Sequence, residues 1–142
     1  MKGQTSGTIP EGFRDPQVRG FVGHNGVIWR RDNADGSITN AMLVEDRHCN
    51  PGGFCHGGWL ATFADIVLVR EAARSGRAPV TINLAIDYLD AVPVGAWVES
   101  RTETVRCSGR VVHVQGVAMD GTSVVLRMNG TFRVQPQNRE ED

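Results

Sequence analysis

The sequence predicts an α+β fold in which an antiparallel sheet of about six strands wraps around one long helix. Three observations lead to this prediction. Residues 57–75 form the one long segment with helical character, and they are apolar over most of their length. The other apolar segments are short, and their apolar and polar residues alternate as they do in strands. The connections between successive strands are short, which favours antiparallel pairing of neighbours.

Two short strands joined by a hairpin are predicted before the helix. Residues 27–29 are β-branched or aromatic, and residues 37–44 alternate between apolar and polar side chains. Between them, Asp35-Gly36 is typical of a tight hairpin turn. A loop over residues 45–55, which contains a proline and two glycines, then leads to the helix.

The helix itself is predicted to begin at Gly57-Gly58 and to end at Ser75-Gly76. Its middle part, residues 59–69, is apolar on nearly every face, so we expect it to be buried on most faces. A sheet wrapped around the helix covers one side. The remaining faces therefore need a partner subunit.

Four further strands are predicted after the helix, separated by turns that contain glycine. In the first of them, side chains repeat every two residues, so Thr81 and Asn83 are expected on one face, with Leu84 and Ile86 on the other. Thr81 and Asn83 then either bond to Asp65 of the helix or to a water, or face solvent. The four strands cover residues 80–89, 97–105, 110–119 and 124–134.

Length, charge and cysteine content limit the class of protein. The 142 residues make one domain, for which we expect a flexible segment at 1–20, a folded part at 21–134 and a polar tail at 135–142. A net charge of −1 shows no basic excess of the kind that binds nucleic acid. No apolar run reaches the roughly 18 residues of a membrane helix. No secretory signal is recognisable and the cysteine count is odd, at 3, which together favour a reduced, cytoplasmic setting.

Asp65 is the most unusual residue of the predicted helix, because it lies between Ala64 and Ile66 in an apolar segment. Burial of a carboxylate without partners is costly, so the position needs a reason. One interpretation is a nucleophile or a general base in a cleft. The other is a structural carboxylate at an interface, held by neighbouring hydroxyls or amides.

His56-Gly57-Gly58 precedes the helix and offers backbone N–H groups at the positive end of its dipole, where a polarised carbonyl or an oxyanion would bind. A plain tight turn is the alternative interpretation. Gly57 and Asp65 are 8 residues apart, which is about 12 Å along a helix, so one substrate atom cannot easily contact both in one chain. A symmetric dimer with antiparallel helices would place Gly57 of one chain opposite Asp65 of the other. Asn50, in the preceding loop, either bonds a ligand carbonyl or an attacking water, or caps a turn.

Two other groups of polar residues have both a binding interpretation and a structural one. His48, Cys49, Cys55 and His56 are of the types that bind zinc, but their spacing does not match known zinc sites, so we predict no metal. Cys49 and Cys55 can alternatively form a disulfide, which a reduced compartment disfavours. The second group clusters at a turn and either binds a phosphate-bearing ligand or is simply solvated. Its members are Arg106, Ser108 and Arg110.

One segment of the sequence reads Asn50-Pro-Gly-Gly-Phe-Cys-His56-Gly57-Gly58-Trp-Leu-Ala-Thr-Phe-Ala-Asp65. It resembles the signature of hotdog-fold acyl-CoA thioesterases of the phenylacetate-pathway (PaaI-like) type. Residues 86–89, followed by Gly95, resemble the next strand of that family, and residues 130–132 resemble its last strand. The resemblance covers residues 21–134. It implies the hotdog fold, homodimers that pair into homotetramers, and active sites at the dimer interface made from both chains.

The resemblance also implies a function, the hydrolysis of an acyl-CoA to a free acid and coenzyme A, with no cofactor other than the coenzyme A of the substrate. It implies that Asp65 is the catalytic carboxylate, that the Gly57 N–H polarises the thioester carbonyl, and that Thr81 assists Asp65. Asn50 and His56 would arrange the nucleophile, the water or the leaving thiolate. The residues expected to contact the substrate are Gly58, Trp59, Phe63, Asn83 and Tyr88, with Arg106, Ser108 and Arg110 at the coenzyme A nucleotide.

Two other functions remain open at this point. A hotdog dehydratase or hydratase acting on an acyl thioester would use a histidine and a carboxylate on one substrate, for which His56 and Asp65 are available. A non-catalytic acyl-CoA-binding module is the third hypothesis. Asp65 argues against it, because a binding module has little use for a desolvated carboxylate.

Overall fold

The computed structural model describes residues 8–76 and 78–135, and it confirms the predicted fold, with one long helix packed against an antiparallel sheet of 6 strands. The chain forms β1 and β2 before the helix and β3 to β6 after it, in the predicted order. The elements are α1 (Phe21–Asn25), β1 (Trp29–Asp32), β2 (Ile38–Leu43), η1 (Asp46–His48), α2 (Gly57–Ala72), η2 (Ala73–Ser75), β3 (Pro79–Tyr88), β4 (Trp97–Ser108), β5 (Val111–Asp120) and β6 (Ser123–Val134).

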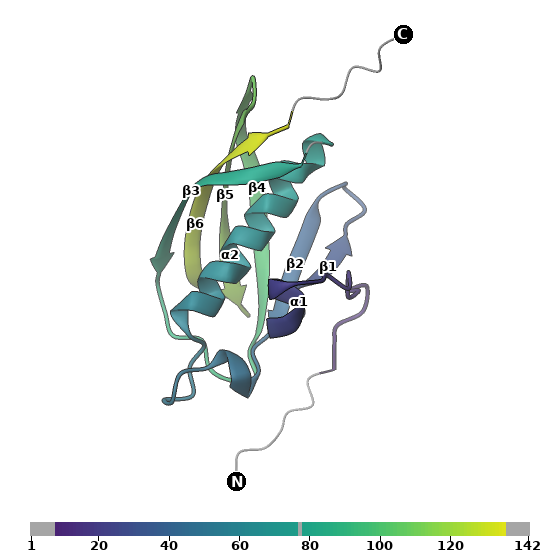
Figure 1. Ribbon diagram of the computed structural model, residues 1–142. Helices are drawn as coiled ribbons and strands as arrows, with labels where there is room; N and C mark the ends of the chain where they lie inside the picture. Colours follow the sequence, from purple (N-terminus) through teal and green to yellow (C-terminus); the bar gives the residue numbers. More distant parts are fainter. Residues whose placement is uncertain (1–7, 77, 136–142) are drawn as a thin grey trace.

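The strands lie in the order β1-β2-β4-β5-β6-β3, and every neighbouring pair is antiparallel. Hairpins join β4, β5 and β6 directly, whereas the chain crosses from β2 through α2 to reach β3 at the far edge of the sheet. In Figure 1 the sheet curves around α2, with α1, β1 and β2 on one side of the helix and β3 on the other.

Only one face of α2 is fully buried within the chain. Phe63, Val67 and Leu68 lie against the sheet with no exposed surface. Asp65, Ile66 and Val69 lie on the other face and remain partly exposed, as do Ala61 and Thr62. Within one chain the sheet contacts the helix from one side, so the expected burial of its remaining faces requires a partner subunit. Among the described residues, no helix is long and apolar enough to span a membrane.

A β-bulge changes the faces of β3. Thr81 pairs with Phe132 and Asn83 pairs with Thr131, so Ile82 is an extra residue without a partner in the register. Paired residues of neighbouring strands share a face, and Phe132 is buried on the helix side. Thr81 therefore faces α2, whereas Asn83 faces away from it. The expectation that Thr81 and Asn83 share a face is wrong, because the bulge interrupts the period of two.

Part of the segment before α1 is held against the sheet. The backbone of Arg14 exchanges hydrogen bonds with that of Arg30 at 2.9 and 3.0 Å, and the Phe13 ring meets the Trp97 ring edge-on at 5.2 Å. Residues 1–7 and 136–142, on which the rest of the expected flexible segment and most of the expected polar tail fall, lie outside the described residues.

Candidate active site

Asp65 and Thr81 are brought together between α2 and the edge strand β3. The Thr81 hydroxyl donates a hydrogen bond to Oδ1 of Asp65 at 2.8 Å. Asp65 is half-buried, and among the described residues no side chain or backbone group bonds its Oδ2. A carboxylate held by one oxygen and open at the other can take a proton from water or attack a carbonyl carbon.

The start of α2 is held by two side chains. His56 is the N-cap, and its Nδ1 accepts a hydrogen bond from the Gly58 N–H at 2.8 Å. This bond assigns the ring proton of neutral His56 to Nε2, which can donate to a ligand. Tyr88, at the end of β3, donates its hydroxyl to the Gly57 carbonyl at 2.9 Å. The predicted residues His56, Gly57, Gly58 and Tyr88 thus form one cluster.

The two glycines have different roles in this cluster. Gly58 already bonds His56 through its N–H, so this N–H is not available to a thioester carbonyl, contrary to the expected role of Gly58. Within the described part of the chain, the Gly57 N–H has no acceptor, and it points out of the first turn of α2. A Cβ on Gly57 would lie 3.6 Å from the Tyr88 ring, an ordinary contact, whereas one on Gly58 would lie 3.0 Å from His56 Nδ1.

Asn50 caps the loop in front of α2. Its Oδ1 accepts hydrogen bonds from the Gly52 N–H at 3.0 Å and the Phe54 N–H at 3.3 Å. The turn-capping interpretation of Asn50 therefore holds within one chain. The side-chain NH₂ remains exposed and can still reach a ligand, because only the oxygen is used by the turn.

A cavity of about 260 Å³ lies beside the start of α2, between α1 and the loop. Trp59 forms part of its wall and stacks on His48 with ring centroids 4.4 Å apart. Burial lowers the pKa of His48. Phe63, expected at the acyl site, instead lies in the core without exposed surface. The residues that line the cavity are Phe21, Asn25, Arg47, His48, Cys49, His56, Gly58, Trp59 and Thr62.

The polar cluster Arg106, Ser108 and Arg110 lies at the other end of the sheet. Arg110 accepts a backbone hydrogen bond from Val134, which pairs with Pro79 at the start of β3. Gly57, in contrast, contacts Tyr88 at the end of β3. Within one chain the structure therefore does not bring this polar cluster to Gly57. Asn83, also expected to contact the substrate, faces away from α2.

Glu71 is a buried carboxylate that the sequence pattern did not single out. It is 5% exposed and pairs with Arg74, with Nη1 3.2 Å from Oε1. The hydroxyls of Thr102 and Thr104 on β4 donate to its two oxygens at 3.3 and 3.5 Å. Because both threonines lie on β4, Glu71 joins the end of α2 to the sheet. The only signal in the sequence is a charged residue at the end of an apolar helix.

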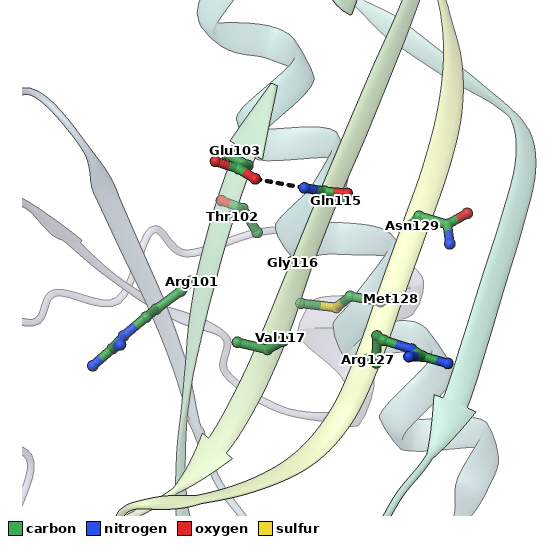
Figure 2. Close-up of a pocket in the computed structure, with 9 residues that line it drawn as sticks. All are labelled: Arg101, Thr102, Glu103, Gln115, Gly116, Val117, Arg127, Met128 and Asn129. Carbon is green, nitrogen blue, oxygen red and sulfur yellow. Dashed lines mark hydrogen bonds between the residues drawn. The ribbon is translucent and has the colours of Figure 1, made fainter. Parts of the chain in front are cut away.

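Another cavity, of about 420 Å³, lies over β4, β5 and β6. Figure 2 shows its lining residues on these three strands, with α2 behind the sheet. Two of its charged groups are already engaged: Arg127 contacts Asp87 at 2.8 Å, and Glu103 accepts from Gln115 at 2.5 Å. None of the residues predicted for catalysis or substrate binding lines this cavity. We therefore place the candidate site at α2 and β3.

The described residues contain no group of three or more His, Cys, Asp or Glu side chains arranged to hold a metal ion. His48 and His56, which belong to the predicted set of zinc-type residues, make other contacts. His48 bonds the Asn25 carbonyl through Nε2 at 2.7 Å, and His56 bonds Gly58. One nitrogen of each histidine ring is therefore already used in a hydrogen bond to the backbone.

Comparison with known proteins gives one family and one fold. The sequence pattern of the Thioesterase superfamily matches residues 52–132. A Pseudomonas aeruginosa protein named "Putative esterase PA0474" is 30% identical over 131 residues, which are 89% of this chain and 97% of that protein. The match to this relative includes the elements that carry Asn50, His56, Gly57, Asp65 and Thr81.

Two crystal structures share the fold. The BH2602 protein of Bacillus halodurans, solved with CoA, has a TM-score of 0.69 at 22% identity, over 75% of this chain and 73% of that one. A hypothetical thioesterase of Streptococcus pneumoniae, solved with coenzyme A, has a TM-score of 0.67 at 22% identity, over 70% and 82%. The latter protein was also crystallised as two variants, in which an Asp and a Thr are each replaced by Ala.

Proposed function

Because the chain belongs to the thioesterase superfamily, we propose that it hydrolyses an acyl-CoA thioester to a free carboxylic acid and coenzyme A, at a site shared by two copies of the chain. The observation that carries this proposal is the hydrogen bond from Thr81 to Asp65, which holds a half-buried carboxylate with one oxygen open. The Asp and Thr replaced in the Streptococcus pneumoniae protein have the same spacing, 16 residues.

Asp65 supplies the reacting oxygen. As a general base, its Oδ2 takes a proton from a water that attacks the thioester carbon. As a nucleophile, the same oxygen attacks that carbon directly, and water later releases the acid. In both routes the C–S bond breaks and the sulfur of coenzyme A leaves with a proton. Thr81 keeps Oδ1 out of the reaction and orients the carboxylate.

The Gly57 N–H polarises the thioester carbonyl. It is the open donor at the start of α2, where the helix dipole favours the negative charge that develops on the carbonyl oxygen. His56 Nε2–H is the second donor and can protonate or hold the leaving thiolate. Gly58 serves this site indirectly, by keeping the His56 ring in place through its N–H.

A second copy of the chain completes the site. Gly57 and Asp65 lie at separate levels of the same helix, about 12 Å apart along its axis. The free edge β3 carries exposed apolar side chains, Val80 at 56% and Ile82 at 57% exposure, and the outer face of α2 adds Ile66 and Val69. Exposed apolar edge strands are prone to pair with another strand. Antiparallel pairing of two β3 strands covers both surfaces and brings Gly57 of one chain toward Asp65 of the other.

The same arrangement provides room for both parts of the substrate. The end of the sheet that carries Arg106, Ser108 and Arg110 then approaches Gly57 of the other chain, where these residues can bind coenzyme A phosphates. The cavity of about 260 Å³ beside His56 and Gly58 takes the acyl group. A cavity of roughly 150 Å³ can hold benzene, so this one suits a single-ring or short acyl group, in line with a PaaI-like substrate. Pairs of such dimers would form the homotetramer.

The test is release of free thiol from a panel of aliphatic and aryl acyl-CoAs, with the acid product identified. The wild-type chain is expected to release coenzyme A, and Asp65→Asn to lower kcat by at least about a hundredfold, the usual loss for a missing base. Asp87→Asn is the matched control, because Asp87 lies on β3 but pairs with Arg127 away from the site. A folded Asp65→Asn protein with full activity would exclude the proposal. Hydration of enoyl thioesters without thiol release would favour a hydratase instead.

A further inference from the structure

Cys49 and Cys55 lie directly opposite each other where two antiparallel segments lead into α2. The His56 N–H donates to the His48 carbonyl at 2.7 Å, and the Asn50 N–H donates to the Phe54 carbonyl at 2.8 Å. These two bonds flank the cysteines, whose own backbone N–H groups donate to the Asp46 and Val92 carbonyls, so Cys49 and Cys55 form a non-hydrogen-bonded antiparallel pair. The Cα atoms of such a pair are about 4.5 Å apart, and their side chains lie on the same face.

The Cα separation of such a pair lies within the range found for disulfides. Bridged cysteines have Cα atoms about 4.4–6.8 Å apart and Cβ atoms about 3.5–4.5 Å apart. The main chain on either side of the cysteines is held in register by the two hydrogen bonds, so the crosslink needs only a rotation of the two side chains. We propose that Cys49 and Cys55 are a disulfide-forming pair that crosslinks the two segments in front of α2.

The two thiols differ in exposure and in pKa, and this difference determines which of them is oxidised first. Cys49 is half-buried and lines the cavity of about 260 Å³, so a small oxidant can reach it. Cys55 is 6% exposed, and burial, assisted by the neighbouring Cys49, raises its pKa to about 12. Cys49 therefore reacts first, since the thiolate is the reactive form.

The oxidant in this reaction is a low-molecular-weight disulfide such as glutathione disulfide. The Cys49 thiolate attacks one of its sulfurs, the S–S bond breaks, and one glutathione leaves as a thiol. The Cys55 sulfur then loses its proton and attacks the Cys49 sulfur, which displaces the second glutathione. Two protein thiols are oxidised to one disulfide, and one glutathione disulfide is reduced to two glutathione thiols.

The position of the pair connects this modification to the candidate site. Asn50 follows Cys49 in the chain, and His56 follows Cys55. The crosslink closes the loop at its base and holds these two residues in the arrangement that the hydrogen bonds already define. We therefore expect the disulfide to stabilise the loop rather than to distort it. Formation of the disulfide does not depend on the proposed thioesterase activity.

The experiment uses the full chain carrying Cys107→Ser, which removes the exposed cysteine of β4. After incubation with glutathione disulfide at mildly alkaline pH, intact mass spectrometry is expected to show the loss of two hydrogens. Peptide mapping is expected to join the peptides of Cys49 and Cys55 from one chain. The matched control adds Cys55→Ala, for which the expected product is one glutathione attached to Cys49.

The thermal midpoint of the oxidised protein is expected to rise by a few degrees, because a closed loop has less freedom when unfolded. A thiol reductant reverses the rise, and the Cys55→Ala control shows none. The proposal is overturned if the protein with both cysteines stops at the glutathione adduct of Cys49, if both thiols still react with an alkylating agent, or if the crosslink joins two chains.

Discussion

The Thr81 hydroxyl donates a hydrogen bond to the Asp65 carboxylate at 2.8 Å, although the two residues are 16 positions apart and lie on different elements. The bond exists because the bulge at Ile82 turns Thr81 toward α2. It connects the reacting carboxylate of the proposed mechanism to the edge strand along which a second chain would pair. The geometry of the carboxylate therefore depends on β3 as well as on the helix.

Replacing Thr81 tests this bond directly. Thr81→Val keeps the shape and branching of the side chain but removes the hydrogen-bond donor. We expect kcat to fall about tenfold with little change in KM. The reason is that the loss of one hydrogen bond to a charged group is worth about 1.5 kcal/mol. Thr81→Ser keeps the hydroxyl and should retain most of the activity. Thr131→Val is the control, since Thr131 is a strand threonine that bonds His113. Equal kcat values for Thr81→Val and Thr81→Ser would contradict an orienting role.

Two neighbouring glycines should respond differently to the same substitution. Gly57→Ala adds a Cβ in ordinary contact with Tyr88, 3.6 Å away, so we expect normal stability. The added methyl group obstructs the approach of the thioester carbonyl to the N–H of residue 57, so we expect kcat to fall at least about tenfold. Gly58→Ala brings a Cβ 3.0 Å from His56 Nδ1, so it should weaken the helix cap by about 1 kcal/mol as well. Thiol release and urea unfolding of both variants measure the difference. A Gly57→Ala protein with wild-type kcat would argue against the Gly57 N–H as the polarising group.

Mixing two variants of low activity tests whether the site is shared between chains. A dimer of one Asp65→Asn chain and one Gly57→Ala chain contains one site with both native residues and one site with neither. After random exchange of chains, half of the dimers are mixed, so we expect about one quarter of wild-type activity to return. Activity is measured before and after refolding the two variants together. If each site were built within one chain, the mixture would stay as inactive as its components.

The stability of the fold should depend on the protonation of His48. Its Nδ1 accepts from the Glu45 N–H at 3.1 Å, a bond that the protonated ring cannot make. Burial lowers the pKa of His48 from 6.5, and the hydrogen bond to the Asn25 carbonyl and the nearby Glu45 carboxylate only partly oppose this. The unfolded chain therefore binds the proton first, and stability falls as the pH falls below the unfolded pKa of about 6.5.

The measurement is the free energy of urea unfolding at several pH values between about 7.5 and 5.5, a range set by the histidine pKa. We expect His48→Gln to be less stable than the wild type at the upper end, because it loses the stacking on Trp59. Its stability should nevertheless change less with pH, since glutamine does not titrate. A slope as steep as that of the wild type would assign the pH dependence to other groups.

The elements of the fold follow from local patterns. The apolar segment that begins at Gly57 forms α2, and the alternating segments after it form β3 to β6 with bounds within three residues of those predicted. The bounds of the short helix α1, Phe21–Asn25, do not follow from the sequence, because five residues that include a glycine carry almost no helical pattern. The bulge at Ile82 was not predicted, since it depends on the register with β6 and not on the sequence of β3 alone.

The sequence by itself determined the long helix, the antiparallel sheet and the presence of an unusual carboxylate at Asp65, because hydrophobic periodicity and turn residues act over a few positions. Only the tertiary structure decided which groups meet: Thr81 with Asp65, Tyr88 with Gly57, and Cys49 with Cys55. The tertiary structure also places Asn83 on the face of β3 opposite Thr81, and it pairs the Gly58 N–H with the His56 ring. These contacts depend on strand register and on the packing of segments far apart in the chain, which a local pattern does not encode.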